Sequence, residues 1–388
     1  MDTHPCKDWL PGALNKEQIE HLAARGVIKF DQKDEIGIAS VDLSISDQGF
    51  AMEGGSIKPS RHRKYSEVLR RRLDLSQGFF ELQKTHTYVL KLGAQLNPEK
   101  VKQFRIYGQA TAKSTIGRVD VLARLIVDGM DRYECFEADN LDGNGEMYVE
   151  VTPITFNIKI KPGSSITQLR LFYGDPEDSE IEGEEVCMTV LRDDSGNPTT
   201  ERRLTLDLQP DTHGGLKASA FRAKPAPHSS DFIDLSSRDL YEPWKYWQFC
   251  ETDSENRLQI KSGRFYILRS KEKLWLPEGV AIYCKASDET IGEMRIHYAG
   301  FVHPHFGTDK DGKQIPTPLI FEVRGHQVDA KLTHGEKMAN LVFYRMSRNA
   351  KHEGKDSYSG QRLQLSKVFR SWPQKLIKID NEGNVEPT

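Results

Sequence analysis

Hydrophobic and polar residues alternate along several short segments of the chain, which is the pattern of half-buried β-strands. The segment 154–161 places isoleucine or phenylalanine at every second position, and 203–208 alternates leucine with polar residues. The polar segment 193–198, which contains glycine and proline, predicts a hairpin turn before the second of these strands. Helix signals are few: a capped helix over 15–26 and a short one within 63–73. The pattern therefore predicts a mainly β protein.

The chain also contains an internal repeat. A glutamate, a glycine and a leucine recur at a constant offset of 172 residues, at Glu150, Gly163 and Leu169 and again at Glu322, Gly335 and Leu341. Upstream, 87–99 and 265–278 each read as an apolar strand that leads to Pro-Glu. A shared offset for three different residue types indicates two duplicated domains.

The length of 388 residues fits two domains, each large enough to bury a core. We place the first domain at 1–185 and the second at 186–373, and we expect 374–388 to be a flexible tail. The acidic run 175–185 is expected to be a solvated connection between the domains.

Composition narrows the class of function. The net charge of -3 gives no cationic field for nucleic acid or an acidic membrane, so an anionic ligand must be held locally. The five cysteines are scattered without a CxxC pair, which is typical of a reducing compartment. No apolar run reaches membrane-spanning length and no signal peptide opens the chain. We therefore expect a cytoplasmic protein.

One polar loop has the chemistry of a phosphate site. In GQATAKSTIGRVDV (108–121), two hydroxyl residues stand between a lysine and an arginine. Backbone N–H groups, hydroxyls and two cationic heads in one loop can hold the phosphates of a nucleotide. This segment resembles the phosphate-binding motif of dCTP deaminases and dUTPases, and the resemblance implies nucleotide contacts by Lys113, Ser114, Thr115 and Arg118. ASVDLSIS (39–46) resembles the strand that opens such domains, in which Asp42 is expected to be structural.

The second half carries a segment that resembles the family's nucleoside-binding hairpin. In YAGFVHPHFG (298–307) the resemblance implies nucleoside contacts by Ala299, Gly300, Phe301, Val302 and His303. His303 stands where the family usually has aspartate. His303 and His305 could also suggest a metal pair, but no third ligand has a recognisable metal spacing, and the zinc deaminase signature is lacking.

The resemblance places the deaminase's catalytic carboxylate at Glu322 in PLIFEVRG and implies that Arg118 acts with it. Metal-independent hydrolysis of the cytosine C4 amine needs a base to activate water and an acid to protonate N3, and one buried carboxylate can serve as both. Glu150, the equivalent position of the first half, is expected to be an ordinary exposed position of its strand.

The segment GKDSYSGQRLQLSKVFRSW (354–372) resembles the family's closing tail, which folds over the bound triphosphate. Tyr358, Gly360 and Gln361 match its core, Ser357 replaces the usual lysine, and Lys355 is a candidate substitute. Together the resemblances span about 28–372.

The resemblance implies two tandem dUTPase-like domains of the β-roll, distorted jelly-roll or β-clip type, with a few short helices. It implies hydrolysis of dCTP to dUTP and ammonia in pyrimidine deoxynucleotide biosynthesis, with Mg²⁺ carried in on the triphosphate and no zinc. The expected ligands are dCTP and dUTP, without nucleic-acid or membrane partners; inhibition by dTTP and homo-oligomer formation are left open. Two alternatives remain at this point: a dUTPase or bifunctional deaminase and diphosphatase, and a non-catalytic nucleotide-binding regulatory β-module.

The two halves retain complementary motifs. The first half keeps the phosphate loop, whereas alignment of the shared Thr-Ile-Gly puts Glu293 of the second half opposite Arg118. An acidic residue there would repel a triphosphate. The hairpin, Glu322 and the closing tail belong to the second half. We therefore expect a composite site, formed either within one chain or between chains.

Overall fold

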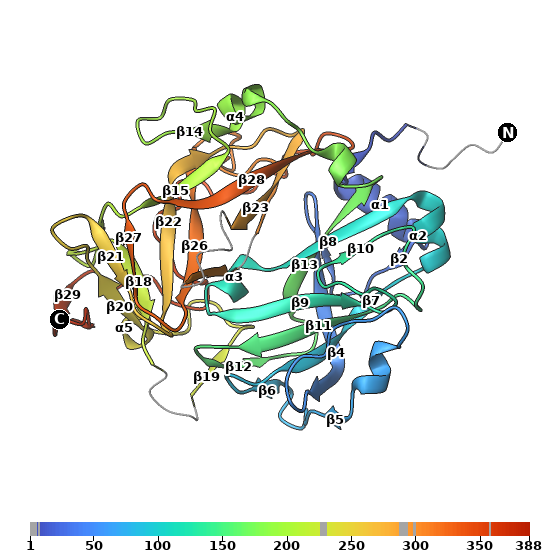
Figure 1. The fold of residues 1–388 in the computed structure, drawn as a ribbon, viewed down its shortest axis with the longest axis horizontal. Coiled ribbons are helices and arrows are strands. Elements are labelled where there is room, and N and C mark those ends of the chain that lie inside the picture. Colours follow the sequence, from blue (N-terminus) through green and yellow to red (C-terminus); the bar gives the residue numbers. More distant parts are fainter. Residues whose placement is uncertain (1–5, 7, 226–230, 287–293, 298–299, 357) are drawn as a thin grey trace.

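The computed structural model describes residues 6, 8–225, 231–286, 294–297, 300–356 and 358–388, with side chains except at 294–297. Most of the ordered elements are strands in two curled antiparallel sheets, one from the N-terminal half (1–185) and one from the C-terminal half (186–388). The two sheets form the two lobes of the molecule, with the short helix α3 (Ser114–Gly117) between them (Figure 1). The fold class expected from the sequence is confirmed.

The sheet of the N-terminal half follows the order β10-β8-β13-β4-β7-β11-β9, and four short strands pair with its members β4, β7 and β13. The strands are β1 (Gly12–Ala13), β2 (Ile28–Lys29), β3 (Glu35–Ile36), β4 (Val41–Ala51), β5 (Arg71–Arg72), β7 (Tyr88–Leu96), β8 (Ile106–Ala112), β9 (Val121–Val127), β10 (Cys135–Phe136), β11 (Glu146–Pro153) and β13 (Ser165–Tyr173).

The sheet of the C-terminal half follows the order β20-β18-β22-β15-β28-β23-β25, and β26 joins β22 to β24. The strands are β14 (Leu191–Arg192), β15 (Arg203–Asp207), β18 (Ala220–Ala223), β20 (Trp247–Cys250), β22 (Phe265–Leu274), β23 (Val280–Ala286), β24 (Met294–His297), β25 (Phe301–Val302), β26 (Thr317–Gly325) and β28 (Lys337–Arg345).

Smaller sheets and short helices complete the fold. The strands are β6 (Phe80–Leu82), β12 (Asn157–Ile160), β16 (Asp211–His213), β17 (Leu216–Ala218), β19 (Phe232–Asp234), β21 (Arg257–Ile260), β27 (Ala330–Thr333), β29 (Leu376–Lys378) and β30 (Val385–Pro387). The other helices are α1 (Lys16–Ala24), α2 (Pro98–Phe104), α4 (Glu184–Val190) and α5 (Pro243–Tyr246), with 3₁₀ turns η1 (Tyr65–Val68) and η2 (Glu177–Ser179). In the described part of the chain, no helix is long and apolar enough to cross a bilayer.

The strand order confirms the duplication. The path β9-β11-β7-β4-β13-β8 in one sheet has its counterpart in β24-β26-β22-β15-β28-β23 in the other. Strands β13 and β28 span the same register at the offset of 172 residues that the sequence shows. Outside the main sheets, β6 pairs with β12 in one half as β21 pairs with β27 in the other. The two halves are therefore copies of one domain.

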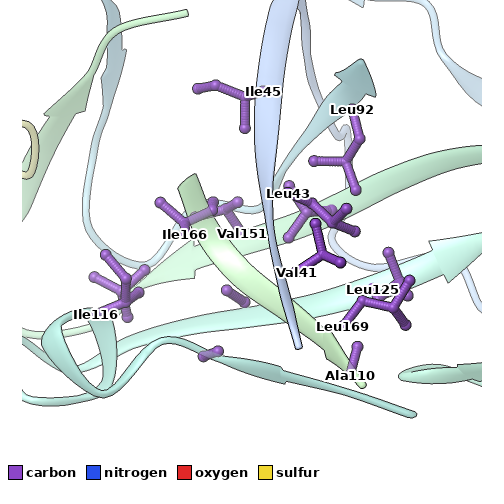
Figure 2. Close-up of a cluster of buried hydrophobic side chains, with 14 of the residues drawn as sticks. Val41, Leu43, Ile45, Leu92, Ala110, Ile116, Leu125, Val151, Ile166 and Leu169 are labelled. Atoms are coloured by element: carbon purple, nitrogen blue, oxygen red, sulfur yellow. The ribbon is translucent and has the colours of Figure 1, made fainter. Parts of the chain in front are cut away.

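Inward-facing residues of successive strands build a core in each half. Figure 2 shows such a cluster in the N-terminal half, where aliphatic side chains from β4, β8, β9, β11 and β13 meet with Ile116 of α3. Ile116 is 3% exposed, so the loop that carries it is anchored in the core. This anchor fixes the position of the residues around it.

The helices follow the sequence only in part. The N-cap of α1 is confirmed: the Asn15 side chain accepts a hydrogen bond from the Gln18 backbone, and the Gln18 side chain accepts one from the Asn15 backbone. In 63–73, where a short helix is expected, the helical residues are those of the 3₁₀ turn η1, whose Tyr65 is buried. Arg71 and Arg72 of the same segment pair with β4 as strand β5.

Two further segments differ from expectation. The strand expected from 154 begins only at Asn157, because the Ile154 backbone donates to the Asp120 carbonyl instead. The acidic run 175–185 is not wholly solvated: it contains η2, and the Ile181 backbone donates to the Phe343 carbonyl of β28.

The last fifteen residues form the hairpin β29–β30 in place of the flexible tail that the sequence predicts. The Phe249 backbone of β20 donates to the Gly383 carbonyl, and Arg222 binds Glu382. A Cβ at Gly383 would lie 1.9 Å from the Phe249 carbonyl oxygen, so only glycine permits this approach. Val385 is 1% exposed, which shows that the hairpin also buries apolar surface.

Candidate active site

A cavity of about 660 Å³ lies between the two halves of the single chain. The N-terminal half contributes the loop after β8, and the C-terminal half contributes β25, β26 and the segment 355–368. The cavity lining includes every described residue that the sequence predicted for the site: Lys113, Ser114, Thr115, Arg118, Gly300, Phe301, Val302, His303, Glu322, Tyr358 and Gln361. Ala299 and Glu293 lie outside the described residues.

The loop after β8 turns sharply beside the cavity. The backbone of Lys113 donates to the Ile166 carbonyl of β13 at 3.0 Å, and a single helical turn, α3, follows. The Lys113 ammonium group forms an ion pair with Asp42, which also lines the cavity. Asp42 therefore orients Lys113 of the candidate site. The strand motif that contains Asp42 did not predict this ion pair.

Arg118 and Glu322 face one another across the boundary between the halves. The Arg118 Nε atom lies 4.0 Å from Glu322 Oε1. Arg118 is 7% exposed and Glu322 is 4% exposed. Glu322 lies on β26, whose neighbours β22 and β24 pair with it on both sides, so its backbone is fixed within the sheet.

Burial perturbs the ionisation of Glu322. It raises the pKa of the Glu322 carboxyl to about 8; Arg118 opposes the rise and the charge of Asp120 adds to it. The carboxyl thus exchanges protons near neutral pH. The Cys284 thiol lines the same cavity, and burial raises the pKa of Cys284 to about 12, so the thiol stays protonated there.

The hairpin that carries His303 is supported from the N-terminal half by Arg170, which is fully buried. Arg170 donates to the Val302 carbonyl at 3.2 Å, and its guanidinium lies 4.1 Å from the Phe301 ring centre. It also lies 3.4 Å from His303 Nδ1, while His303 Nε2 is 3.2 Å from the Gln168 side-chain oxygen. An arginine can only donate, so Nδ1 accepts and Nε2–H donates to Gln168.

Burial, and then the charge of Arg170, lower the pKa of His303 to about 3. His303 is therefore a neutral residue with a fixed tautomer. It joins the two halves at the cavity wall. His305, the other histidine of the hairpin, instead contacts the Ala350 carbonyl, so the two rings do not converge on one point.

Described residues of the segment 355–368 line the cavity and contact both halves. The Gln361 side chain accepts a hydrogen bond from Arg118 at 3.0 Å and donates one to the Pro318 carbonyl at 3.1 Å. The Tyr358 ring stacks on Phe306 with 5.7 Å between the ring centres and is 42% exposed. Gln361 thus fixes Arg118, while Tyr358 stays accessible at the cavity edge.

Glu150 corrects an expectation from the sequence. This equivalent of Glu322 is 2% exposed, not an exposed position of its strand. Arg124 of the neighbouring strand binds it in an ion pair, and the Tyr133 hydroxyl donates to it at 3.3 Å. The burial follows from the Arg124 partner, which satisfies the carboxylate within one half.

The cavity also includes residues that the sequence did not single out. Ser236, Ser237 and Arg238 line it from the C-terminal half. They reach it because β19 pairs in parallel with β12 of the other half. No local motif marks this segment, since its position depends on a contact between distant strands. Among the described residues, no three His, Cys, Asp or Glu side chains form a metal-ligand set.

Comparison with known proteins gives results that agree with this geometry. The family model for the N-terminal domain of 2'-deoxycytidine 5'-triphosphate deaminase matches residues 10–175, and the model for its C-terminal domain matches residues 180–369. The chain is also similar to a crystal structure of 2'-deoxycytidine 5'-triphosphate deaminase from Agrobacterium tumefaciens, with 25% sequence identity and a TM-score of 0.74. That match covers 88% of this chain and 99% of the other. No curated protein sequence matches the chain.

Proposed function

Because the chain belongs to the dCTP deaminase family, with an N-terminal and a C-terminal domain of that family in one polypeptide, we propose that it hydrolyses dCTP to dUTP and ammonia. The observation that carries this proposal is the buried Glu322 carboxyl on the wall of the cavity, 4.0 Å from the Arg118 guanidinium. A carboxyl with a pKa near neutrality can both accept and donate a proton during one turnover.

In the proposed reaction, the Glu322 carboxylate takes a proton from water as the hydroxide adds to C4 of cytosine. Glu322 delivers this proton to N3. It then takes the proton of the new C4 hydroxyl and passes it to the amino group, which leaves as ammonia while the C4 carbonyl forms. The product is uracil with a proton on N3, and Glu322 ends the cycle as a carboxylate, so no protein group is consumed.

Arg118 has two roles in this proposal. Its positive charge favours the ionised form of Glu322, and its hydrogen bond to Gln361 ties the closing segment to the site. The hydroxyls of Ser114 and Thr115 and the Lys113 ammonium group supply donors for the triphosphate. Mg²⁺ would enter with the triphosphate, on which it neutralises charge. The hairpin 300–303 lines the space that the nucleoside would occupy.

Glu322→Gln tests this proposal. The amide keeps the shape of the side chain but cannot take a proton from water, so we expect kcat for ammonia release to fall by at least about 10³-fold, at the strong end for loss of acid–base catalysis. Binding of dCTP should persist. Glu150→Gln is the matched control, because it changes the same position in the other copy and should leave the kcat of the folded enzyme unchanged.

The products settle the alternative activities. Incubation with dCTP should give dUTP and ammonia in equal amounts, without dUMP or pyrophosphate, and dUTP alone should remain intact. Release of pyrophosphate from either nucleotide would instead establish a diphosphatase activity. Full turnover by Glu322→Gln, or loss of turnover in Glu150→Gln alone, would refute the role proposed for Glu322.

A further inference from the structure

Two pairs of charged residues cross the boundary between the halves side by side. The loop after α3 carries Arg118 and Asp120, and β26 carries Glu322 and Arg324. Arg118 faces Glu322, whereas Asp120 forms an ion pair with Arg324. In each element one residue separates the two charged residues. The loop has the positive charge first and β26 has the negative charge first, so opposite charges face each other. The second pair therefore fixes the same two elements that position the first.

The backbone on both sides supports this arrangement. Residues i and i+2 of a strand point to the same face, so Glu322 and Arg324 both face the N-terminal half. Asp120 has φ 58°, a left-handed conformation in which the chain turns from α3 into β9. The turn lets Arg118 and Asp120 both face β26.

The Asp120–Arg324 pair is buried and well connected. Asp120 is 0% exposed, and the Thr155 hydroxyl donates to its carboxylate at 2.6 Å. Arg324 donates to the Thr155 hydroxyl at 2.6 Å and to the Gly263 carbonyl at 2.7 Å. Burial raises the pKa of Asp120, while the hydrogen bonds from Arg324 and Thr155 oppose the rise and favour the carboxylate. A buried pair held by several hydrogen bonds permits little displacement of either partner.

The equivalent strand of the N-terminal half, β11, has no arginine at the position of Arg324. The offset of 172 residues places Thr152 at the position of Arg324, and the Thr152 hydroxyl contacts the Thr87 hydroxyl of its own half at 3.0 Å. There, the equivalent glutamate, Glu150, is also bound within its own half by Arg124. Of the two equivalent strands, only β26 therefore contacts the other half through both of these positions, Glu322 and Arg324.

We propose that Asp120 and Arg324 are positioning residues: their ion pair holds the phosphate-loop segment of the first half against β26, so that Arg118 faces Glu322 in the geometry needed for turnover. This inference rests on the proposed deaminase function. The charge of Asp120 acts on the same carboxyl, since it adds to the raised pKa of Glu322.

Asp120→Asn separates this role from a merely structural one. Asparagine fits the left-handed backbone and keeps the shape of the side chain, but it leaves Arg324 without a carboxylate partner. We expect kcat to fall about ten- to hundredfold, because a displacement of about 1 Å in a reacting group has effects of this size. KM for dCTP should change less than kcat, since the donors of the phosphate loop remain.

The pH profile gives the second readout. Turnover requires ionised Glu322, so kcat rises with pH through the pKa of this group. The charged groups around it are Arg118, Asp120 and Arg324, together with the Cys284 thiol. Loss of the negative charge at Asp120 lowers the pKa of Glu322, so the rise in kcat should move to lower pH in Asp120→Asn. A change in folding alone would lower the amount of active enzyme without moving the profile.

Three further variants complete the test. Thr155→Val removes only the bridging hydroxyl and is expected to lower kcat a few-fold; it decides the question if Asp120→Asn does not fold. Glu150→Gln removes a buried ion pair within one half and should move neither kcat nor the pH profile. Glu322→Gln must be inactive, because turnover in this variant would refute the role proposed for Glu322, and a wild type that releases no ammonia from dCTP would refute the proposed function, both independently of Asp120.

The positioning role is overturned if Asp120→Asn has the kcat and pH profile of the wild type. If Glu322→Gln is inactive in the same experiment, the role proposed for Glu322 still stands. If Asp120→Asn fails to fold, unchanged kcat in Thr155→Val would overturn the positioning role equally. Reduced kcat with the profile moved to lower pH in Asp120→Asn, or reduced kcat in Thr155→Val, is the result we expect.

Discussion

Glu322→Gln should stabilise the nucleotide-free protein, and the gain should grow as the pH rises from about 5 to 8. In the native protein, burial raises the pKa of Glu322 from its ordinary value of 4.5 to about 8. The native carboxyl therefore keeps a proton that the unfolded chain releases. Its contribution to the free energy of unfolding is fully present below pH 4.5 and is lost as the pH rises toward 8.

The size of the effect follows from the interval between the two pKa values. At about 1.4 kcal/mol per pH unit, an interval of about 3.5 pH units sets an upper limit of about 5 kcal/mol. Relaxation of the site reduces the loss, so we expect about 1–3 kcal/mol between pH 5 and 8. Glutamine resembles the protonated acid in size and lacks its titration, so the variant should escape this loss.

Urea unfolding of the wild type and Glu322→Gln at about pH 5, 6.5 and 8 measures the difference directly. All other titrating groups are common to both proteins, and their contributions cancel in the difference. Glu150→Gln serves as the control, because it leaves Arg124 without its carboxylate and should destabilise the protein throughout. A stability difference between Glu322→Gln and wild type that stays constant or shrinks as the pH rises would refute the reasoning.

Two other predictions concern metal dependence and the chain that forms the site. Activity should require Mg²⁺ for the triphosphate but no bound transition metal; stoichiometric zinc in the purified enzyme, with activity lost on its removal and restored by its return, would contradict this. A mixture of Arg118→Ala and Glu322→Gln proteins that has exchanged subunits should stay inactive, because Arg118 and Glu322 meet within one chain; restored deaminase activity would show that sites form between chains.

Much of the architecture could be predicted because its signals are local or periodic. Alternation of apolar residues predicted the strands, and the constant offset from Glu150 to Glu322 predicted the duplication that the strand order confirms. The loop that contains Arg118 and the strand that contains Glu322 were identified from short motifs. The structure brings them together in one cavity, as a composite arrangement requires.

The remaining features depend on contacts between distant residues, which local patterns do not encode. The burial of Glu150 is set by Arg124 on the next strand, and alternation alone cannot distinguish a paired carboxylate from a solvated one. Arg238 reaches the cavity only because β19 pairs with a strand of the other half. The terminal hairpin docks through Gly383 against the backbone of β20, although its polar composition is also typical of a disordered end.

The duplication explains why the two equivalent glutamates have different environments. In the first copy, Arg124 forms an ion pair with Glu150 and its guanidinium lies 4.1 Å from the Tyr133 ring centre, so this carboxylate is neutralised within its own half. In the second copy, Glu322 has its cation at 4.0 Å, supplied by the other half, and an open cavity beside it. Burial raises the pKa of Glu322 to about 8, so its carboxyl exchanges protons near neutral pH. The same strand position can therefore serve packing in one copy and proton transfer in the other.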